Sequence, residues 1–241
     1  MKRILTVIIL LLGLKTFAQD ISSFTLPYIY AELGYSEVLY KFRSTSVEQL
    51  YPPSSSYHAF DFTIGARLSS KITLEGQFNK NNHDPEIEYK LDGEEPVTLS
   101  IGIDSKVENL RIGIKYLAFS YKKYVGIYAG AGIKLMHSNI YGHGYSSILQ
   151  NAQGDTLGTL DLLLTTGSNT ILATYLSLNA EVKVWKWISV IGSIEYDQGN
   201  TPLYTAYWSM TDYSTGNIYQ SSYSYTGSEF LIRAGLRIGI Y

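Results

Sequence analysis

Apolar and polar residues alternate with a period of two along most of this chain, and this pattern limits its fold more than any other feature. The alternation is clearest from Ile232 to Ile240, where every second residue is apolar and the residues between them are arginine or glycine. A period of two is that of a β-strand whose two faces meet different surroundings, and no comparable helical periodicity occurs. The sequence therefore predicts an all-β chain.

Eight segments carry the alternation. The predicted strands cover residues 27–35, 60–68, 72–78, 110–116, 125–134, 172–184, 188–196 and 230–240. Short connections of three or four residues, at 69–71, 120–123 and 185–187, alternate with long ones of more than twenty residues. If consecutive strands are antiparallel neighbours, all short connections lie at one end and all long ones at the other, as in outer-membrane barrels. We therefore expect an eight-stranded antiparallel up-and-down transmembrane β-barrel with short periplasmic turns and long extracellular hairpin loops.

The long connections contain turn signals of their own. Asp92-Gly93, Gln153-Gly154-Asp155 and Ser214-Thr215-Gly216-Asn217 each suit the tip of a hairpin. Alternating apolar residues precede and follow the first of these turns. Several strands are therefore expected to continue beyond the membrane.

The first residues have the layout of a secretory signal peptide. Lys2 and Arg3 precede an apolar run that ends at Thr16-Phe17-Ala18, so we expect cleavage after Ala18 and a barrel domain over residues 19–241. Loss of three cations would move the formal charge from −2 to about −5. The chain contains no cysteine, which excludes disulfides and thiolate chemistry. No segment has the roughly 20 consecutive apolar residues that a transmembrane helix needs.

Periodicity alone does not distinguish a membrane barrel from a soluble lipocalin-like carrier, whose apolar face points inward. The polar faces favour the membrane barrel, because their many glycines would relieve crowding in a narrow lumen and their charges are of both signs. The expected lumen charge network comprises Glu32, Asp61, Arg67, Glu75, Arg111, Lys115, Lys134, Glu181, Lys183, Glu195, Arg233 and Arg237. Aromatic residues gather near both ends of the strands, as two bilayer interfaces would select.

With eight alternating strands, long outer loops and a final strand ending Leu236-Arg237-Ile238-Gly239-Ile240-Tyr241, the chain resembles the OmpA/OmpX-type family of small outer-membrane barrels. The resemblance implies an outer-membrane location in a Gram-negative bacterium, contact with lipid and lipopolysaccharide, and recognition of Tyr241 by the barrel-assembly machinery. The chain differs from the two-domain members of that family, because no peptidoglycan-binding domain is expected after the last strand.

Catalysis is the weaker functional hypothesis. Two enzyme families of small barrels that resemble this chain act on lipid A with His and Ser, which makes His137, beside Ser138, and His143 candidates, with Asp155 or Asp161 as orienting carboxylates. Neighbouring residues on a strand point to opposite faces, however, so His137 is not expected to activate Ser138. The stretch 81–84 lacks the spacing of a calcium loop, so no metal site is expected. The sequence also has no glycine-rich phosphate loop and no basic aromatic patch, so no cofactor or nucleic-acid surface is expected.

The last long connection is rich in tyrosine, a residue that supplies large contact area at low entropic cost. The candidate binding surface comprises Tyr204, Tyr207, Trp208, Tyr213, Tyr219 and Tyr223; alternatively these rings cover one another on a protruding hairpin. The leading hypothesis is a non-enzymatic envelope protein whose loops contact a surface protein or glycan. A narrow channel remains an alternative, since eight strands leave no wide pore.

Overall fold

The computed structural model describes residues 25–45, 50–51, 56–82, 86–89, 97–100, 106–138, 144–150 and 154–241. The regular elements in these ranges are all β-strands: β1 (Ile29–Thr45), β2 (Leu50–Tyr51), β3 (Ser56–Arg67), β4 (Ile72–Asn82), β5 (Glu86–Tyr89), β6 (Val97–Ser100), β7 (Lys106–Tyr121), β8 (Val125–Ser138), β9 (Gly144–Gln150), β10 (Thr156–Thr166), β11 (Thr170–Lys183), β12 (Ile188–Gly199), β13 (Tyr204–Asp212) and β14 (Ile218–Ile240). The described part contains no helix that could span a membrane. The predicted signal peptide lies outside the described residues.

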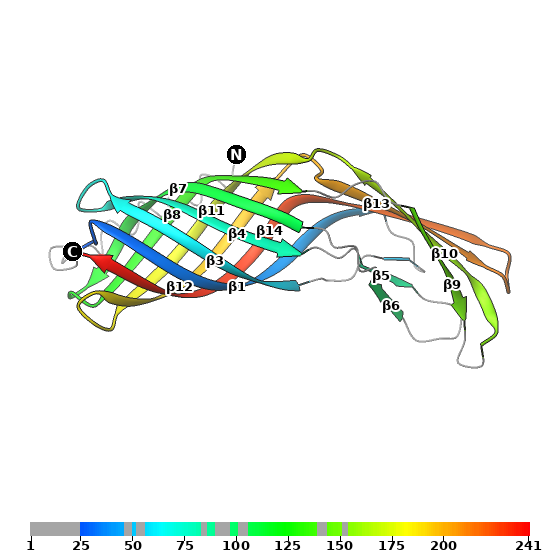
Figure 1. The fold of residues 1–241 in the computed structure, drawn as a ribbon, viewed down its shortest axis with the longest axis horizontal. Coiled ribbons are helices and arrows are strands. Elements are labelled where there is room, and N and C mark those ends of the chain that lie inside the picture. The colour runs from blue at the N-terminus through cyan, green and yellow to red at the C-terminus, as the bar shows by residue number, and fades with distance from the viewer. Residues whose placement is uncertain are drawn as a thin grey trace.

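Eight of the strands form a closed antiparallel barrel. They follow one another in the order β1-β3-β4-β7-β8-β11-β12-β14, and β1 pairs with β14 to close it, with Ile29 opposite Ile240. The turns after β3, β7 and β11 share one end, whereas the longer connections leave from the other (Figure 1). The eight strands correspond to the eight predicted segments, so the predicted fold class is confirmed.

The alternation places apolar side chains outside the barrel and polar ones inside. Leu33, Phe60 and Leu236 on the outer face are 68%, 78% and 57% exposed, whereas Glu32 and Arg237 beside them in the sequence or on the neighbouring strand are buried. An apolar band of this extent around a barrel is suited to lipid and not to water. The soluble lipocalin-like alternative is therefore wrong, because its apolar face would line the interior.

Glycines on the inner face make room for large side chains. A β-carbon on Gly113 would collide with the hydroxyl of Tyr175, whose ring extends from β11 over Gly132 of the neighbouring strand β8. The predicted role of these glycines in relieving crowding thus applies at this position.

Beyond the barrel, the sheet continues through the N-terminal part of β14 into three further strands, and we call this four-stranded part the extension sheet. Its order is β14-β13-β10-β9, and it arches away from the barrel at the end of the long connections (Figure 1). The predicted hairpin at Ser214-Thr215-Gly216-Asn217 is confirmed between β13 and β14, where Asp212 N donates to the Asn217 carbonyl at 3.0 Å. Strands β9 and β10 pair across the second predicted turn, and β5 and β6 pair across the first, whose Asp92-Gly93 tip lies outside the described residues.

Strand β14 belongs to both the barrel and the extension sheet. Residues 229–238 of β14 pair with β12 in the barrel, and residues 218–225 pair with β13 in the extension sheet. The change of partner occurs at an irregularity in the pairing with β1, over residues 226–228. Gly227 has a φ of 74° there and faces Met136, so a side chain at this position would meet both backbone strain and a collision.

An apolar core stabilises the extension sheet from one side. Its members from the sheet are Leu149, Leu160, Leu162, Leu164, Tyr204, Ala206, Trp208, Met210, Tyr223 and Tyr225. Val107, Met136 and Ile171 join the same core from the upper end of the barrel lumen. The extension sheet is therefore packed onto the mouth of the barrel.

Candidate functional site

The barrel lumen is filled by charged side chains that form ion pairs across it. Seven carboxylates and five cations are buried there: Glu32, Asp61, Glu75, Glu181, Glu195, Asp197 and Glu229, with Arg111, Lys115, Lys134, Arg233 and Arg237. Each of these carboxylates contacts at least one of the cations. Such pairing is required, because an unpaired charge buried in a protein interior costs several kcal/mol.

In the half of the lumen nearer the short turns, which we call the lower half, two arginines of β14 bridge carboxylates from three strands. Arg237 contacts Glu32 and Glu181, each at 2.8 Å. Arg233 contacts Glu32 as well, and its Nε donates to Asp61 Oδ1 at 2.7 Å. The guanidinium of Arg237 also lies 3.9 Å from the ring centroid of Tyr30, whose hydroxyl donates to Glu75 at 2.9 Å. These contacts connect β1, β3, β4, β11 and β14.

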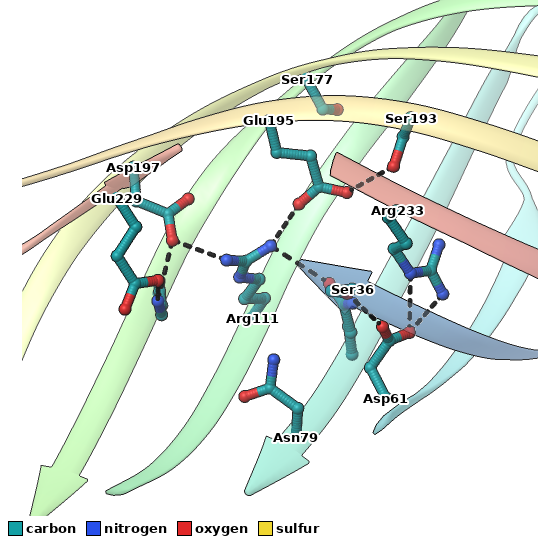
Figure 2. A network of polar contacts seen from close by, with 12 residues as sticks. Ser36, Asp61, Asn79, Arg111, Ser177, Ser193, Glu195, Asp197, Glu229 and Arg233 are labelled. Carbon is teal, nitrogen blue, oxygen red and sulfur yellow. Dashed lines mark hydrogen bonds and ion pairs between the residues drawn. The ribbon is translucent and has the colours of Figure 1, made fainter. Parts of the chain in front are cut away.

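In the upper half, Arg111 and Lys134 hold three carboxylates together (Figure 2). Arg111 contacts Asp197 at 2.6 Å and also Glu195. Lys134 contacts Asp197 at 2.8 Å and also Glu229. The group therefore links β7, β8, β12 and β14.

Hydroxyl groups supply further hydrogen bonds to several of the carboxylates, which outnumber the cations by two in the described lumen. Tyr128 and Ser189 donate to Glu181 at 2.5 and 2.7 Å, and Ser36 donates to Asp61 at 2.9 Å. Tyr225 donates to Glu229. Because hydrogen bonds to a carboxylate stabilise its charged form, these donors offset the shortage of cations.

Ten of the twelve residues predicted for the lumen network lie in it, and two do not. Arg67 and Lys183 lie at the periplasmic end, where they donate to the carbonyls of Leu26 and Thr25 at 3.1 and 2.7 Å. These two cations therefore hold the segment that precedes β1. The prediction for these two residues is corrected, because each is the last residue of its strand and lies at the end of the barrel.

Sequence reasoning missed Asp197 and Glu229. The sequence pattern predicts both at the edges of the last long connection, directly beside the predicted strand ends at 196 and 230. The signal that could have found them is the alternation itself, since Asp197 follows Ser193 and Glu195 at a spacing of two.

Apolar residues close both ends of the charged lumen. Leu26, Leu117 and Tyr128 form a buried cluster at the periplasmic end. At the outer end, Met136 is fully buried beneath the core of the extension sheet. Among the described residues, the charged interior thus lies between two apolar clusters.

Of the two histidine candidates, the structure describes His137, and its ring lies on the opposite face of β8 from Ser138. His137 points outward and contacts the hydroxyl of Thr170 at 3.0 Å, whereas Ser138 is buried on the opposite face. His143 lies outside the described residues. Asp155 follows the β9–β10 turn, and Asp161 lies within β10 on the extension sheet. Among the described residues, no group of three or more His, Asp or Glu side chains could hold a metal ion.

His137 belongs to a polar row just above the apolar band. Lys80, Glu108, His137 and Thr170 lie opposite one another on four neighbouring strands, and Lys80 contacts Glu108 at 2.7 Å. This hydrogen bond from Lys80 lowers the pKa of Glu108. Directly below the row come Phe78, Leu110, Leu135 and Leu172, all exposed. The row marks where the lipid-facing surface ends.

The aromatic residues of the last long connection divide between the two faces of the extension sheet. Tyr204, Trp208 and Tyr223 are buried in its core, and Tyr219 packs against that core. Tyr207 and Tyr213 are 48% and 57% exposed. The predicted binding surface is therefore corrected: three of its six residues are covered while the extension sheet is folded, and mutual packing accounts for them.

Asp212 caps the β13–β14 hairpin at the tip of the extension sheet. Its carboxylate accepts hydrogen bonds from Ser214 N and Ser214 Oγ at 2.8 and 2.7 Å and from Thr215 Oγ1 at 2.9 Å. The hydrogen bonds from Ser214 lower the pKa of Asp212 below its ordinary value.

We predict that this turn loosens in acid. A group whose pKa is lowered in the folded state contributes stability above its ordinary pKa of about 3.9 and loses it as the pH falls through the lowered value. Amide exchange at Ser214 and Gly216 should therefore accelerate below about pH 4 in the native protein. In Asp212→Asn the exchange should vary with pH only as the intrinsic chemistry does; an acid-dependent step that persists in this variant would contradict the assignment.

Tyr241 follows the last barrel strand at the periplasmic end. Its ring centroid lies 3.8 Å from Lys183 Nζ, and its side chain is partly buried. The ring is therefore accessible from the short-turn end of the barrel.

Comparison with known proteins identifies the fold. No family model and no curated protein matches the chain. Among solved structures, the outer membrane protein OprG from Pseudomonas aeruginosa matches with a TM-score of 0.52 at 10% identity, over 92% of this chain and 100% of that one. Neisserial surface protein A matches with a TM-score of 0.47 at 12% identity, over 88% and 97% of the two chains. The similarity to OprG shows that the chain has the fold of a small outer-membrane β-barrel.

Proposed function

We propose, on the premise that this chain folds as a small outer-membrane β-barrel, that it is a non-enzymatic protein of the Gram-negative outer membrane. Its sealed barrel anchors an extracellular sheet that contacts external molecules. Fold alone does not assign a function, so the proposal rests on the distribution of side chains. The observation that carries it is the extension sheet, which has its own apolar core and lies beyond the lipid-facing band.

The proposal places lipid and lipopolysaccharide around the band and the barrel-assembly machinery at the final strand with Tyr241. A rigid anchor suits a contact surface, because preorganised sites bind with less loss of conformational entropy. The ion-paired lumen supplies that rigidity, since it joins all eight barrel strands through buried contacts.

Surface accessibility of the extension sheet tests the proposal. An epitope inserted between Thr215 and Gly216, at the exposed tip of the β13–β14 hairpin, should be labelled on intact cells. A matched epitope inserted at Lys122, in the turn after β7, should be labelled only after the outer membrane is permeabilised. Both proteins should change mobility on boiling, which shows a folded barrel. Labelling of neither epitope on intact cells, or of both, would overturn the proposed topology.

We predict that the barrel does not conduct ions. The lumen is filled by ion pairs and closed by apolar clusters at both ends, so no water-filled path crosses it. Folded protein in planar bilayers should give no discrete current steps at voltages where a control porin does. Reproducible steps from protein that is fully heat-modifiable would favour the narrow-channel alternative.

We also predict that His137→Ala leaves lipid A unchanged. His137 faces outward and Ser138 faces inward, so the pair lacks the hydrogen bond that nucleophile activation needs. Mass spectra of lipid A from cells that carry the variant, the native chain or no gene should coincide. A lipid species that depends on the gene and disappears with His137→Ala would support the enzyme alternative.

A further inference from the structure

The outer face of the extension sheet carries a groove that runs across its four strands. The groove has a volume of about 720 Å³, within the range of small-molecule sites. One wall is the cross-strand row Ser146, Asp161, Ser209 and Gln220, and the other is the row Gly144, Leu163, Tyr207 and Ser222. Between these rows, Leu162, Trp208 and Ser221 are buried on the other face of the sheet, so backbone forms the groove floor there, whereas Tyr145 on the edge strand β9 is 53% exposed.

The first wall consists entirely of hydrogen-bonding side chains. One residue comes from each strand, and neighbouring strands lie about 4.8 Å apart, so donors and acceptors recur at that interval along the groove. The Asp161 carboxylate accepts, the Gln220 amide both donates and accepts, and the two serines do either. Such a row suits an elongated ligand that carries many hydroxyl groups.

The second wall is partly apolar. The side chains of Tyr207 and Leu163 are 48% and 54% exposed and lie opposite each other on β13 and β10. An exposed tyrosine ring offers a flat apolar surface with a polar edge, which matches the C–H face of a pyranose ring. The first wall can therefore hydrogen-bond the hydroxyl groups of a sugar, and the second can cover the C–H face of its ring.

The charge and the ends of the groove narrow the ligand further. Its lining residues include one carboxylate and neither lysine, arginine nor histidine, so phosphate, sulfate and carboxylate groups are disfavoured. At the β9 end, no residue of the described part of the chain lies within 4 Å of where a β-carbon of Gly144 would stand.

The floor of the groove is held in place from below. Leu162 and Trp208, which lie between the two walls in sequence, are each 2% exposed on the core side. The walls consequently project from a packed sheet and not from a mobile loop, which lowers the entropic cost of binding.

We propose that this groove binds a neutral oligosaccharide, with Asp161 and Gln220 hydrogen-bonding its hydroxyls and Tyr207 stacking on a ring. The inference rests on the proposed extracellular position of the extension sheet. An extended peptide is the less suited occupant, because it would pair along the edge of β9 and not across the strands.

The test is direct binding to a glycan array that carries neutral, sialylated and sulfated oligosaccharides, using the full chain in lauryldimethylamine oxide. Maltoside detergents are unsuitable, since their headgroup is itself a neutral sugar. Neutral glycans should bind, Tyr207→Ala and Asp161→Asn should each weaken binding by about tenfold or more, and Tyr207→Phe should retain most of it. Tyr213→Ala, at an exposed position outside the groove, is the matched control and should bind as the native chain does.

Three results would overturn the inference: no neutral glycan bound, binding confined to sulfated or sialylated glycans, or equal affinity of the native chain and Tyr207→Ala. The epitope experiment separates this failure from that of the proposed function. A hairpin tip labelled on intact cells without glycan binding would reject the groove alone, whereas an unlabelled tip would reject the extracellular position on which both depend.

Discussion

Replacing Arg233 with methionine should lower the free energy of unfolding of the barrel by about 3–5 kcal/mol, because it leaves a buried carboxylate without its cation. Arg233 is 3% exposed and contacts both Glu32 and Asp61. Glu32 keeps its contact with Arg237, but Asp61 retains only the hydroxyl of Ser36. Urea titration in detergent, followed by the mobility of unboiled samples, measures the change.

A double variant identifies the cause. Arg233→Met with Asp61→Asn removes the stranded charge together with its partner, so it should recover part of the lost stability. Lys80→Met, which breaks the exposed pair with Glu108 outside the barrel, should change stability by no more than about 0.5 kcal/mol. If the double variant were less stable than Arg233→Met, loss of packing and not unpaired charge would be the cause.

Replacing Trp208 with alanine should unfold the extension sheet while the barrel stays intact. The indole is 2% exposed, and truncating a buried tryptophan costs about 3–5 kcal/mol. Its Nε1 has no hydrogen-bond partner among the described residues, so the loss is one of packing, and Trp208→Phe should cost much less. Limited proteolysis should then cleave β10 or β13 in Trp208→Ala and leave a heat-modifiable barrel fragment.

The matched control is Tyr207→Ala, the next residue, whose side chain lies on the exposed face. It should leave the extension sheet as resistant to protease as in the native chain. Loss of heat-modifiability in Trp208→Ala would show that the extension sheet and the barrel unfold as one unit, contrary to this expectation.

The barrel could be predicted from sequence because its two faces meet opposite environments. Every second residue from Ile232 to Ile240 faces lipid, and Arg233 and Arg237 between them face the lumen. The same rule extended beyond the membrane: Tyr204, Ala206, Trp208 and Met210 alternate with Thr205, Tyr207 and Ser209. This alternation reflects a buried face of the extension sheet. Because the segment lies beyond the predicted barrel strands, its aromatic residues are predicted from the sequence to form a binding surface.

The ion pairs could not be predicted because they depend on register. Arg233 meets Glu32 across 201 residues of sequence, and a shift of one residue in the pairing of β1 with β14 would separate them. The groove is equally invisible in the sequence. Ser146, Asp161, Ser209 and Gln220 come from four strands, and only the pairing of β9, β10, β13 and β14 brings them into one row.

The dual membership of β14 couples the extension sheet to the barrel. It is the last described strand in the sequence, and it supplies both the seam that closes the barrel against β1 and the strand against which β13 pairs. Closure of the barrel depends on the pairing of β14 with β1, which is distant in sequence, whereas β13 and β14 pair as a hairpin of consecutive strands and can do so earlier in folding. Packing of the extension sheet has a different requirement, because its apolar core includes Val107, Met136 and Ile171 of three barrel strands. A fully packed extension sheet therefore indicates that the barrel below it has formed.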